Sequence, residues 1–372
     1  MISRSRVWLT ASALLLVASC TGQTEPPVPE TSSTSASSSM TASSAMVGPA
    51  EIDRRVELIA GASGRYRELL RAFVVTIDGQ PAAEHYGQNG GPEVRSNVYS
   101  VTKSILSMLI GSAIDDGSIA GVEQSIGELL PAYLPVMAPR VADVTVRQLL
   151  TMTGGVVADE NLSAAFASED WVSEILATPL DQPAGTEFGY SGAGYHLLAA
   201  IIATTTGQSP LDYARDRLLG PLGIVSEPAA EPVAVLDPAA SPDNSTGFGW
   251  SVDPRGVNVG YGELRITAND MAKLGQLYLN EGEWRGQQIV PASWVVDSTS
   301  SASGAGYGYG WWIDEAAGHA SFAALGRSGQ IIEVVPDLGL VVVISALDGP
   351  GAFNNFDLLD IVEQQIVPAV GS

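Results

Sequence analysis

The chain is poor in the residue types that build disulfide cross-links and metal centres. Its 372 residues include one cysteine, Cys20, and three histidines, His85, His196 and His319. A single cysteine excludes an intramolecular disulfide framework and a cysteine-based metal site or nucleophile. The histidines stand alone, without the spacing of metal ligands, so we expect no metal site and no cofactor. His196 lies in an apolar run and is predicted to be a core residue.

Positive charge is also scarce. The chain has 18 lysines and arginines against 41 acidic residues, which gives a formal net charge of −23 at pH 7. So acidic a chain is expected to have no nucleic acid among its partners, because a phosphate backbone would be repelled. Only Lys103 and Lys273 are lysines, and arginine supplies all other positive charge.

The N-terminus has the layout of an export signal. Arg4 and Arg6 precede an apolar stretch that is too short for a comfortable membrane span and ends in Val-Ala-Ser-Cys20. This ending resembles a bacterial lipobox, so we predict a signal peptide over residues 1–19 and lipid attachment at Cys20. The expected location is the outer face of a bacterial membrane, held there only by the lipid. The alternative is ordinary secretion with an incidental cysteine.

Residues 20–50 are rich in serine, threonine and proline and nearly free of charge and aromatic side chains. Such a segment cannot bury enough apolar surface to order itself, so it is predicted to be a disordered tether. The folded body would then span residues 51–372.

The body shows strand signals near both ends and helix signals between them, which favours an α+β fold. We expect one antiparallel sheet, flanked by helices, built from residues 51–99 and 301–372, with an all-helical subdomain inserted over residues 100–300. A capping box is expected where Asp270 follows Thr267 by three residues. The predicted helices are 51–59, 100–114, 145–152, 191–206, 209–219, 267–281 and 354–367, and the predicted strands are 73–77, 82–86, 309–313, 330–335 and 340–347.

The most informative motif is Ser100-Val-Thr-Lys103 at the start of an apolar helical run. Residues three apart share a helix face, so the Lys103 amine can reach the Ser100 hydroxyl. Burial disfavours the charged form of an amine, and a neutral lysine can take the serine proton and create a nucleophile. Arginine cannot do this, because guanidinium stays protonated. A Ser-x-x-Lys match by itself can arise by chance.

Two further blocks are candidates for the same site. Tyr190 lies in a glycine-rich loop before an apolar helix and could pass a proton between Ser100 and a leaving group. The same stretch nearly matches a nucleophile elbow centred on Ser191, but residues 183–186 are a poor strand and the elbow needs one. Loop aromatics also commonly serve packing alone.

The third block is Arg327-Ser328-Gly329, in a turn before an apolar strand. Gly329 would let the backbone approach a ligand, and Arg327 could attract a substrate carboxylate or influence Lys103. Its alternative role is a surface salt bridge. Trp250, Trp311 and Trp312 either line a substrate cleft or pack in the core, and core packing is favoured; Trp250 and Trp312 are the two retained as candidate substrate-binding residues.

Together the three blocks resemble the serine β-lactamase-related family, which includes class C β-lactamases, DD-carboxypeptidases, certain esterases and 6-aminohexanoate-dimer hydrolases. Residues 146–155, 220–223, 264–278 and 307–312 agree with it too, so the likeness covers about residues 73–347. The resemblance implies a β-lactamase/transpeptidase-like fold with Ser100 as acylated nucleophile, Lys103 as general base and Tyr190 as proton-transfer group. It also implies an oxyanion hole formed by the backbone N–H groups of Ser100 and Gln330.

The chain departs from the family pattern at two positions. Gly192 stands where many members have asparagine, and Arg327 stands where many have lysine or histidine. The missing asparagine argues against a dedicated β-lactamase. The resemblance therefore favours a serine hydrolase that cleaves a small-molecule or peptide ester or amide through an acyl-enzyme. The alternatives are a DD-carboxypeptidase or β-lactamase-like envelope enzyme, or a catalytically silent binding module.

Overall fold

A computed structural model describes residues 48–62, 64–157, 166–227, 247–301 and 304–371, all within the unit Ser44–Ser372. The predicted signal peptide, the lipidation site Cys20 and nearly all of the predicted tether lie outside these ranges. Among the helices of the described ranges, none combines the length and the apolar composition that crossing a membrane requires.

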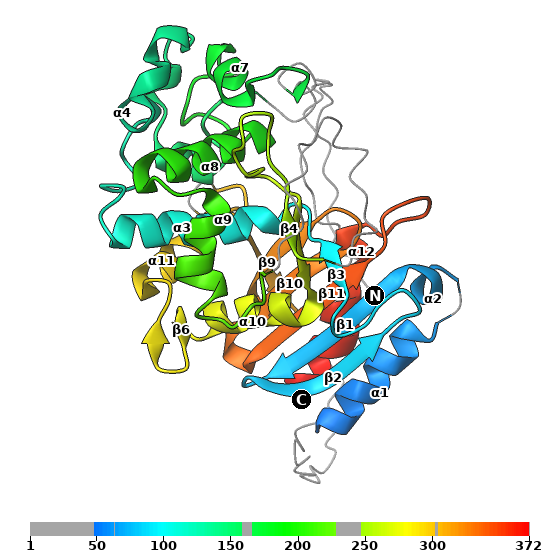
Figure 1. Cartoon of the computed structure of the whole chain (residues 1–372). Helices are drawn as coiled ribbons and strands as arrows, with labels where there is room; N and C mark the ends of the chain where they lie inside the picture. Colours follow the sequence, from blue (N-terminus) through cyan, green and yellow to red (C-terminus); the bar gives the residue numbers. More distant parts are fainter. Residues whose placement is uncertain (1–47, 63, 158–165, 228–246, 302–303, 372) are drawn as a thin grey trace, which may run out of the picture. The chain divides into compact units, whose positions relative to one another are not determined.

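The body is organised around a six-stranded sheet whose strands come from both ends of the described chain (Figure 1). The strand order is β2-β1-β11-β10-β9-β8, and every neighbouring pair is antiparallel. The expectation of one antiparallel sheet from the two termini is therefore confirmed. Its strands are β1 (Leu70–Ile77), β2 (Gln80–Tyr86), β8 (Trp312–Ala316), β9 (His319–Gly326), β10 (Gln330–Val335) and β11 (Leu340–Ala346).

Two central strands contain long apolar runs, Ala72–Val75 in β1 and Leu340–Ile344 in β11, because both faces of the sheet are covered. Val75 of β1 is opposite Val342 of β11, and both side chains belong to one apolar core. Their neighbours Val74 and Val343 point to the other face and belong to a second core. Side chains alternate along a strand, so a sheet buried on two faces needs apolar residues at successive positions.

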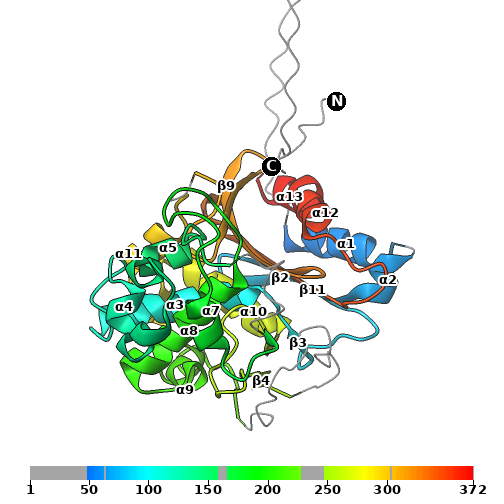
Figure 2. The same ribbon diagram turned by 90° about the horizontal axis from the view of Figure 1, so that it is seen from above.

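Helices from both chain ends cover one face of the sheet (Figure 2). They are α1 (Pro49–Ala60), α12 (Asn355–Ile361), the π-helical turn η7 (Val362–Ile366) and α13 (Val367–Val370). Ile52, Val56 and Ala60 recur every four residues on α1 and are all buried. This i, i+4 spacing puts one apolar stripe of α1 on the sheet.

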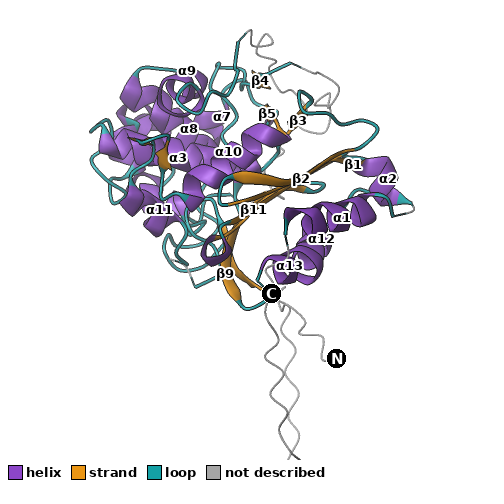
Figure 3. Cartoon of the chain, turned by 90° about the horizontal axis from the view of Figure 1, so that it is seen from below, coloured by secondary structure: helices purple, strands orange, loops and turns teal. Residues whose placement is uncertain are grey.

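The larger helical part lies on the other face (Figure 3). At its centre is α3 (Val101–Asp115), which is buried from Val101 to Ala113, as the all-apolar pattern predicted. Around it are α4 (Ile126–Leu129), α5 (Val146–Leu150), α7 (Trp171–Ala177), α8 (Gly192–Thr206), α9 (Pro210–Ala214), η4 (Arg215–Leu219) and α11 (Ala292–Ser298). Shorter elements are α2 (Arg65–Leu69), η1 (Pro131–Val136), η2 (Val141–Asp143), η6 (Pro336–Leu338), β6 (Glu283–Trp284) and β7 (Gln287–Gln288).

The helix α10 (Ala268–Leu279) begins with the predicted capping box, in which Thr267 and Asp270 bond each other's backbone N–H groups. It packs on the sheet, where Gly275 is so close to Val341 and Ile332 that a Cβ atom would collide with their side chains. We therefore assign α10 to the sheet part, which corrects the predicted helical subdomain of residues 100–300.

One predicted strand is shifted and another strand was missed. β8 begins at Trp312 instead of residue 309, and β9 was not predicted. A small second sheet also crosses the predicted helical region, with the order β3 (Arg95–Asn97), β5 (Leu264–Thr267) and β4 (Gly249–Trp250). This sheet joins the segment just before Ser100 to residues far along the chain.

Candidate active site

Ser100 occupies the turn that leads from β3 into α3. Tyr99, the residue before it, has a left-handed φ of 46°. The Asn97 side chain holds this conformation, because its Oδ1 accepts the Tyr99 N–H at 2.8 Å. Ser100 is the N-cap residue of α3, yet its hydroxyl makes no capping hydrogen bond. The hydroxyl is therefore available for another partner.

That partner is Lys103. Its Nζ lies 2.9 Å from Ser100 Oγ and donates to the backbone carbonyl of Tyr261 at 3.0 Å. The lysine side chain is 2% exposed. Within the described ranges no carboxylate forms an ion pair with Lys103. The predicted contact between this amine and the serine hydroxyl is present, and the rings of Tyr190, Tyr195 and Tyr261 lie around the amine.

Tyr190, the third residue of the predicted group, lies with its ring beside Lys103. Its ring centroid is 4.8 Å from Lys103 Nζ, and its ring stacks on Trp312 with centroids 6.1 Å apart. Trp312 also meets Tyr307 and Phe188 edge-on. Tyr190, Trp312 and Phe188 are partly exposed, while Tyr307 is buried. Tyr190, Trp312 and Phe188 form a partly exposed set, hereafter the aromatic wall, beside the buried amine.

Ser191 has a structural role. It is the N-cap of α8, where its Oγ accepts the Gly194 N–H at 3.1 Å and donates to the Val157 carbonyl at 2.7 Å. The residue is 4% exposed, and the described residues 178–190 directly before it form no strand. This arrangement lacks the strand and the exposed hydroxyl of a nucleophile elbow.

The turn after β9 forms a polar cluster next to Tyr99. Asp348 accepts hydrogen bonds from Arg327 at 2.7 Å, from Ser328 Oγ at 2.6 Å and from the Tyr99 hydroxyl at 3.1 Å. The Arg327 guanidinium also lies over the Tyr99 ring, 4.8 Å from its centroid. The salt-bridge alternative for Arg327 is thus present, and its side chain remains 58% exposed.

This cluster fixes the charge of Asp348. Burial alone would raise the pKa of Asp348, but the Ser328 hydroxyl, the Arg327 charge and the Tyr99 hydroxyl outweigh it and hold the pKa below its usual value. A carboxyl with a lowered folded-state pKa contributes stability above its unfolded-state pKa, and this contribution is lost as pH falls through the folded-state value.

Asp348→Asn should therefore lower the melting temperature at pH 7. The expected loss in the free energy of unfolding is about 1 kcal/mol or less, because the Asp348 side chain is partly solvated. The difference from wild type should shrink below about pH 4, where the unfolded-state carboxyl takes up its proton. Thermal melts of both proteins from pH 7 to pH 3 measure this. Asp357→Asn, at the exposed pair with Arg65, is the control and should change little. A difference that stays constant with pH would contradict the assigned role of Asp348.

Three predicted site residues are placed differently from expectation. Trp250 is 2% exposed and donates its indole N–H to the Val259 carbonyl, so it belongs to the core and not to a cleft. A Cβ at Gly329 would meet Leu358 at 2.9 Å, so this glycine permits packing against α12 and not approach of a ligand. Ser328 is 5% exposed and binds Asp348. Trp311 is buried, as favoured, whereas Trp312 is in the aromatic wall.

Gln330 also lies deeper than expected for an oxyanion donor. It is fully buried, opposite Gly326 in the β9–β10 pair, and its side-chain amide donates to the Ala346 carbonyl at 2.6 Å. The sheet residue that contacts the turn carrying Ser100 is Gly326. A Cβ atom there would collide with the Val98 carbonyl. The end of β9, and not the start of β10, therefore lies against the turn that carries Ser100.

Sequence reasoning missed the Tyr261 carbonyl, Asp348 and Tyr99. Tyr99 directly precedes the predicted nucleophile, and this adjacency was the one signal available for it. The histidines form pairs with carboxylates: His85 with Glu57, His196 with Asp253, and His319 with Asp337. Among the described residues, no three His, Cys, Asp or Glu side chains are grouped so as to hold a metal ion.

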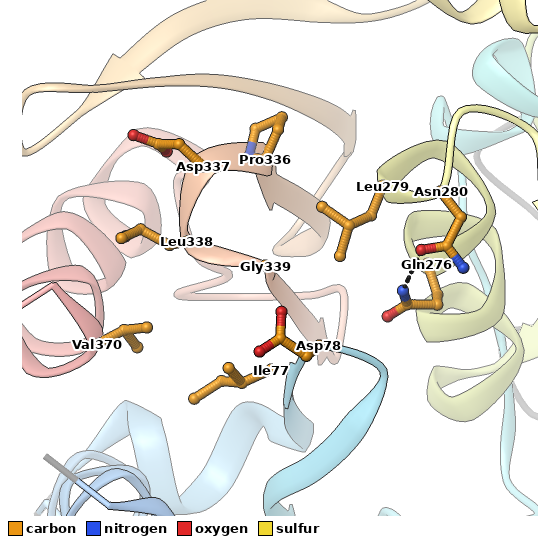
Figure 4. A pocket seen from close by; sticks show the side chains of 10 residues that line it. All are labelled: Ile77, Asp78, Gln276, Leu279, Asn280, Pro336, Asp337, Leu338, Gly339 and Val370. Atoms are coloured by element: carbon orange, nitrogen blue, oxygen red, sulfur yellow. Dashed lines mark hydrogen bonds between the residues drawn. The ribbon is translucent and has the colours of Figure 1, made fainter. Parts of the chain in front are cut away.

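A large pocket lies away from Ser100, between the end of α10 and two turns of the sheet (Figure 4). Its volume is about 550 Å³, and its polar side chains come from Asp78, Gln276, Asn280 and Asp337. Gln276 and Asn280 bond each other at 2.9 Å. No serine or lysine lines this pocket, so it offers no alternative to the Ser100 site.

Comparison with known proteins supports the assignment of this site region to a known family. Penicillin-binding protein 4 of Amycolatopsis lactamdurans is 25% identical over 274 residues, which cover 66% of this chain and 70% of that protein. The 6-aminohexanoate-dimer hydrolase of Paenarthrobacter ureafaciens is 26% identical over 242 residues, which cover 60% of this chain and 55% of that protein.

The structure of EstCE1, a hydrolase with promiscuous acyltransferase activity, superposes with a TM-score of 0.67 at 16% identity and covers 87% of this chain and 99% of that one. Residues 57–364 match the family described as Beta-lactamase. The resemblance and the fold class expected from the sequence are confirmed, and the chain belongs to the beta-lactamase family, within the serine hydrolase superfamily.

Proposed function

We propose that this protein is a serine hydrolase that cleaves an ester or amide through an acyl-enzyme on Ser100. The observation that carries the proposal is the 2.9 Å contact between Lys103 Nζ and a Ser100 hydroxyl that makes no capping bond. The same amine is buried among tyrosine rings. An amine held this close to the serine oxygen can take its proton as the oxygen attacks a carbonyl carbon.

In the proposed reaction, Lys103 takes the proton of Ser100 Oγ as this oxygen attacks the substrate carbonyl carbon. The tetrahedral intermediate expels the alcohol or amine, which receives a proton by way of Tyr190, and Ser100 is left as an ester. Water then attacks this ester while the Lys103–Tyr190 pair takes its proton, and the acid is released. The proton that Ser100 loses leaves with the alcohol or amine, and the proton taken from water returns to Ser100 Oγ as the acyl–oxygen bond breaks.

The oxyanion needs two N–H donors near Ser100. We propose that one is the Ser100 N–H, at the positive end of the 15-residue helix α3. The second comes from the end of β9, at the Gly326–Arg327 peptide, in place of the Gln330 N–H. Two contacts support placing the second donor at this peptide. Gly326 lies against Val98, and the Arg327 guanidinium lies over the Tyr99 ring.

The aromatic wall suggests which substrates fit. Tyr190 and Trp312 present apolar rings beside the reacting groups, which favours an apolar acyl or leaving group. Trp312→Ala should raise KM for phenyl or butyl esters about tenfold, equivalent to about 1.4 kcal/mol of lost contact. KM for acetate esters of small alcohols should change much less. Equal effects on both ester classes would contradict a binding role for Trp312.

One screen separates the candidate activities. Short-chain esters, linear amides, D-Ala-D-Ala peptides and cephalosporins are each offered to wild type and to Ser100→Ala. Turnover of esters or amides that is lost in Ser100→Ala supports the proposal. Preference for D-Ala-D-Ala peptides would indicate a DD-carboxypeptidase, and preference for cephalosporins a β-lactamase-like enzyme. Binding without turnover, unchanged in Ser100→Ala, would indicate a silent binding module.

We also propose that the protein is exported and anchored by lipid at Cys20, as the lipobox-like sequence suggests. Metabolic labelling with a fatty acid should mark wild type and not Cys20→Ser, and the variant should appear in the soluble extracytoplasmic fraction. Equal labelling of both proteins would refute lipidation at this cysteine.

A further inference from the structure

A buried histidine–aspartate pair lies behind the loop whose carbonyl binds Lys103. His196 Nε2 is 3.2 Å from Asp253 Oδ2, and both side chains are fully buried. His196 belongs to α8, and Asp253 lies in the loop between β4 and β5. The other described histidine–carboxylate pairs, at His85 and His319, are partly exposed. Neither His196 nor Asp253 takes part in the proposed proton transfers.

The hydrogen-bond geometry selects one tautomer of the ring. The Gly260 backbone N–H points at His196 Nδ1, at 3.5 Å. A backbone N–H can only donate, so Nδ1 must be the unprotonated nitrogen. The ring proton is therefore on Nε2 and is donated to Asp253. The imidazole thus links the carboxylate on one side to the Gly260 amide on the other.

The same carboxylate also shapes the loop. Asp253 Oδ1 accepts the backbone N–H groups of Arg255 at 2.9 Å and of Val257 at 2.8 Å. Farther along, Gly260 lies so close to α8 that a Cβ atom would collide with the Tyr195 carbonyl. The next residue is Tyr261, whose carbonyl accepts the Lys103 Nζ hydrogen bond at 3.0 Å.

We infer that His196 and Asp253 are positioning residues for the general base. They hold the Gly260–Tyr261 peptide against α8, so that the Tyr261 carbonyl takes one N–H of Lys103 and keeps its nitrogen directed at Ser100 Oγ. The inference rests on the proposed function, because it assigns the pair a role in acylation. It predicts that disturbing the pair slows proton removal without altering substrate binding.

Asp253→Asn tests the link with little change in volume. Its side-chain NH2 would face the Nε2–H of His196, so the ring must move its proton to Nδ1, where it opposes the Gly260 N–H. Stopped-flow measurement with a chromogenic ester should show an acylation rate constant at least about tenfold lower, in line with loss of part of a general-base contribution. The substrate dissociation constant should stay within about twofold, below the roughly tenfold change that loss of a binding contact causes.

Gly260→Ala displaces the same carbonyl by a different route, because its Cβ must move away from Tyr195. The same kinetic change is expected. His196→Asn places an amide oxygen near the position of Nδ1 and should keep more acylation activity than His196→Ala. His319→Asn, at the partly exposed pair, is the matched control and should leave both constants unchanged.

Hydrogen exchange gives a readout that needs no activity and uses the wild-type protein. The Gly260 amide should exchange slowly in wild type, and faster in Asp253→Asn, because its acceptor is lost. A Gly260 amide in wild type that exchanges as fast as an exposed loop amide would overturn the inference, even if both variants fail to fold. Acylation within twofold of wild type in both Asp253→Asn and Gly260→Ala would also overturn it, and would leave the role of Ser100 intact. A wild type that forms no acyl-enzyme would instead refute the proposed function.

Discussion

Lys103→Arg is expected to reduce the rate of acyl-enzyme formation by about a thousandfold, within the range measured for loss of a general base. Lys103 Nζ is 2.9 Å from the Ser100 hydroxyl and lies in a site where the described residues place no carboxylate against it. A guanidinium keeps the positive charge but cannot accept the serine proton. The substitution therefore removes base function while it retains a cation.

The other lysine of the chain provides a matched control. Lys273 binds Asp270 and the Gly223 carbonyl, each at 3.0 Å, and its side chain is 29% exposed. Lys273→Arg can keep both contacts and should leave acylation unchanged. Circular dichroism and thermal melting establish that both variants are folded. Acylation by Lys103→Arg at more than a tenth of the wild-type rate would show that another group serves as the base.

Tyr190→Phe is expected to lower turnover of alkyl esters and amides by about a hundredfold, the lower end of the range for general acid–base groups. The phenyl ring can still stack on Trp312 and face Lys103 Nζ, so KM should change little. Alkoxide and amide leaving groups need a proton, whereas p-nitrophenolate leaves without one. Hydrolysis of p-nitrophenyl esters should therefore fall much less.

The comparison of leaving groups makes the role of Tyr190 specific. Tyr86→Phe, at a hydroxyl that binds Glu84 and Asn269 at the edge of the sheet, is the control for loss of a tyrosine hydroxyl. An equal loss for p-nitrophenyl and alkyl esters in Tyr190→Phe would mean that the hydroxyl positions the substrate and does not donate a proton. Full activity with both would remove Tyr190 from the mechanism.

Features with local causes could be predicted from the sequence. The Ser100–Lys103 contact follows from i, i+3 geometry on one helix, and the capping box at Thr267 follows from a four-residue pattern. The sheet could be predicted because β1, β10 and β11 contain apolar runs, such as Ala72–Val75 and Leu340–Ile344. β9 could not, because its sequence is rich in alanine, which has low strand propensity, and its pairing with β10 decides its structure.

Contacts between segments far apart in the chain could not be predicted from sequence patterns. The Tyr261 carbonyl reaches Lys103 across 158 positions, and the Tyr99 hydroxyl reaches Asp348 across 249. Gly329 was expected to let the backbone approach a ligand, whereas it packs against Leu358 of α12, a contact that the sequence did not indicate. Trp250 was among the proposed cleft residues for the same reason, because burial depends on the whole fold.

Mass mapping of the covalent adduct tests the central claim most directly. Wild-type protein is treated with a fluorophosphonate, digested, and the modified peptide is sequenced by tandem mass spectrometry. The modification should lie on Ser100, should be absent in Ser100→Ala and should form far more slowly in Lys103→Arg. An adduct on Ser191 or another serine, or ester hydrolysis that persists in Ser100→Ala, would contradict the assignment of Ser100 as the nucleophile.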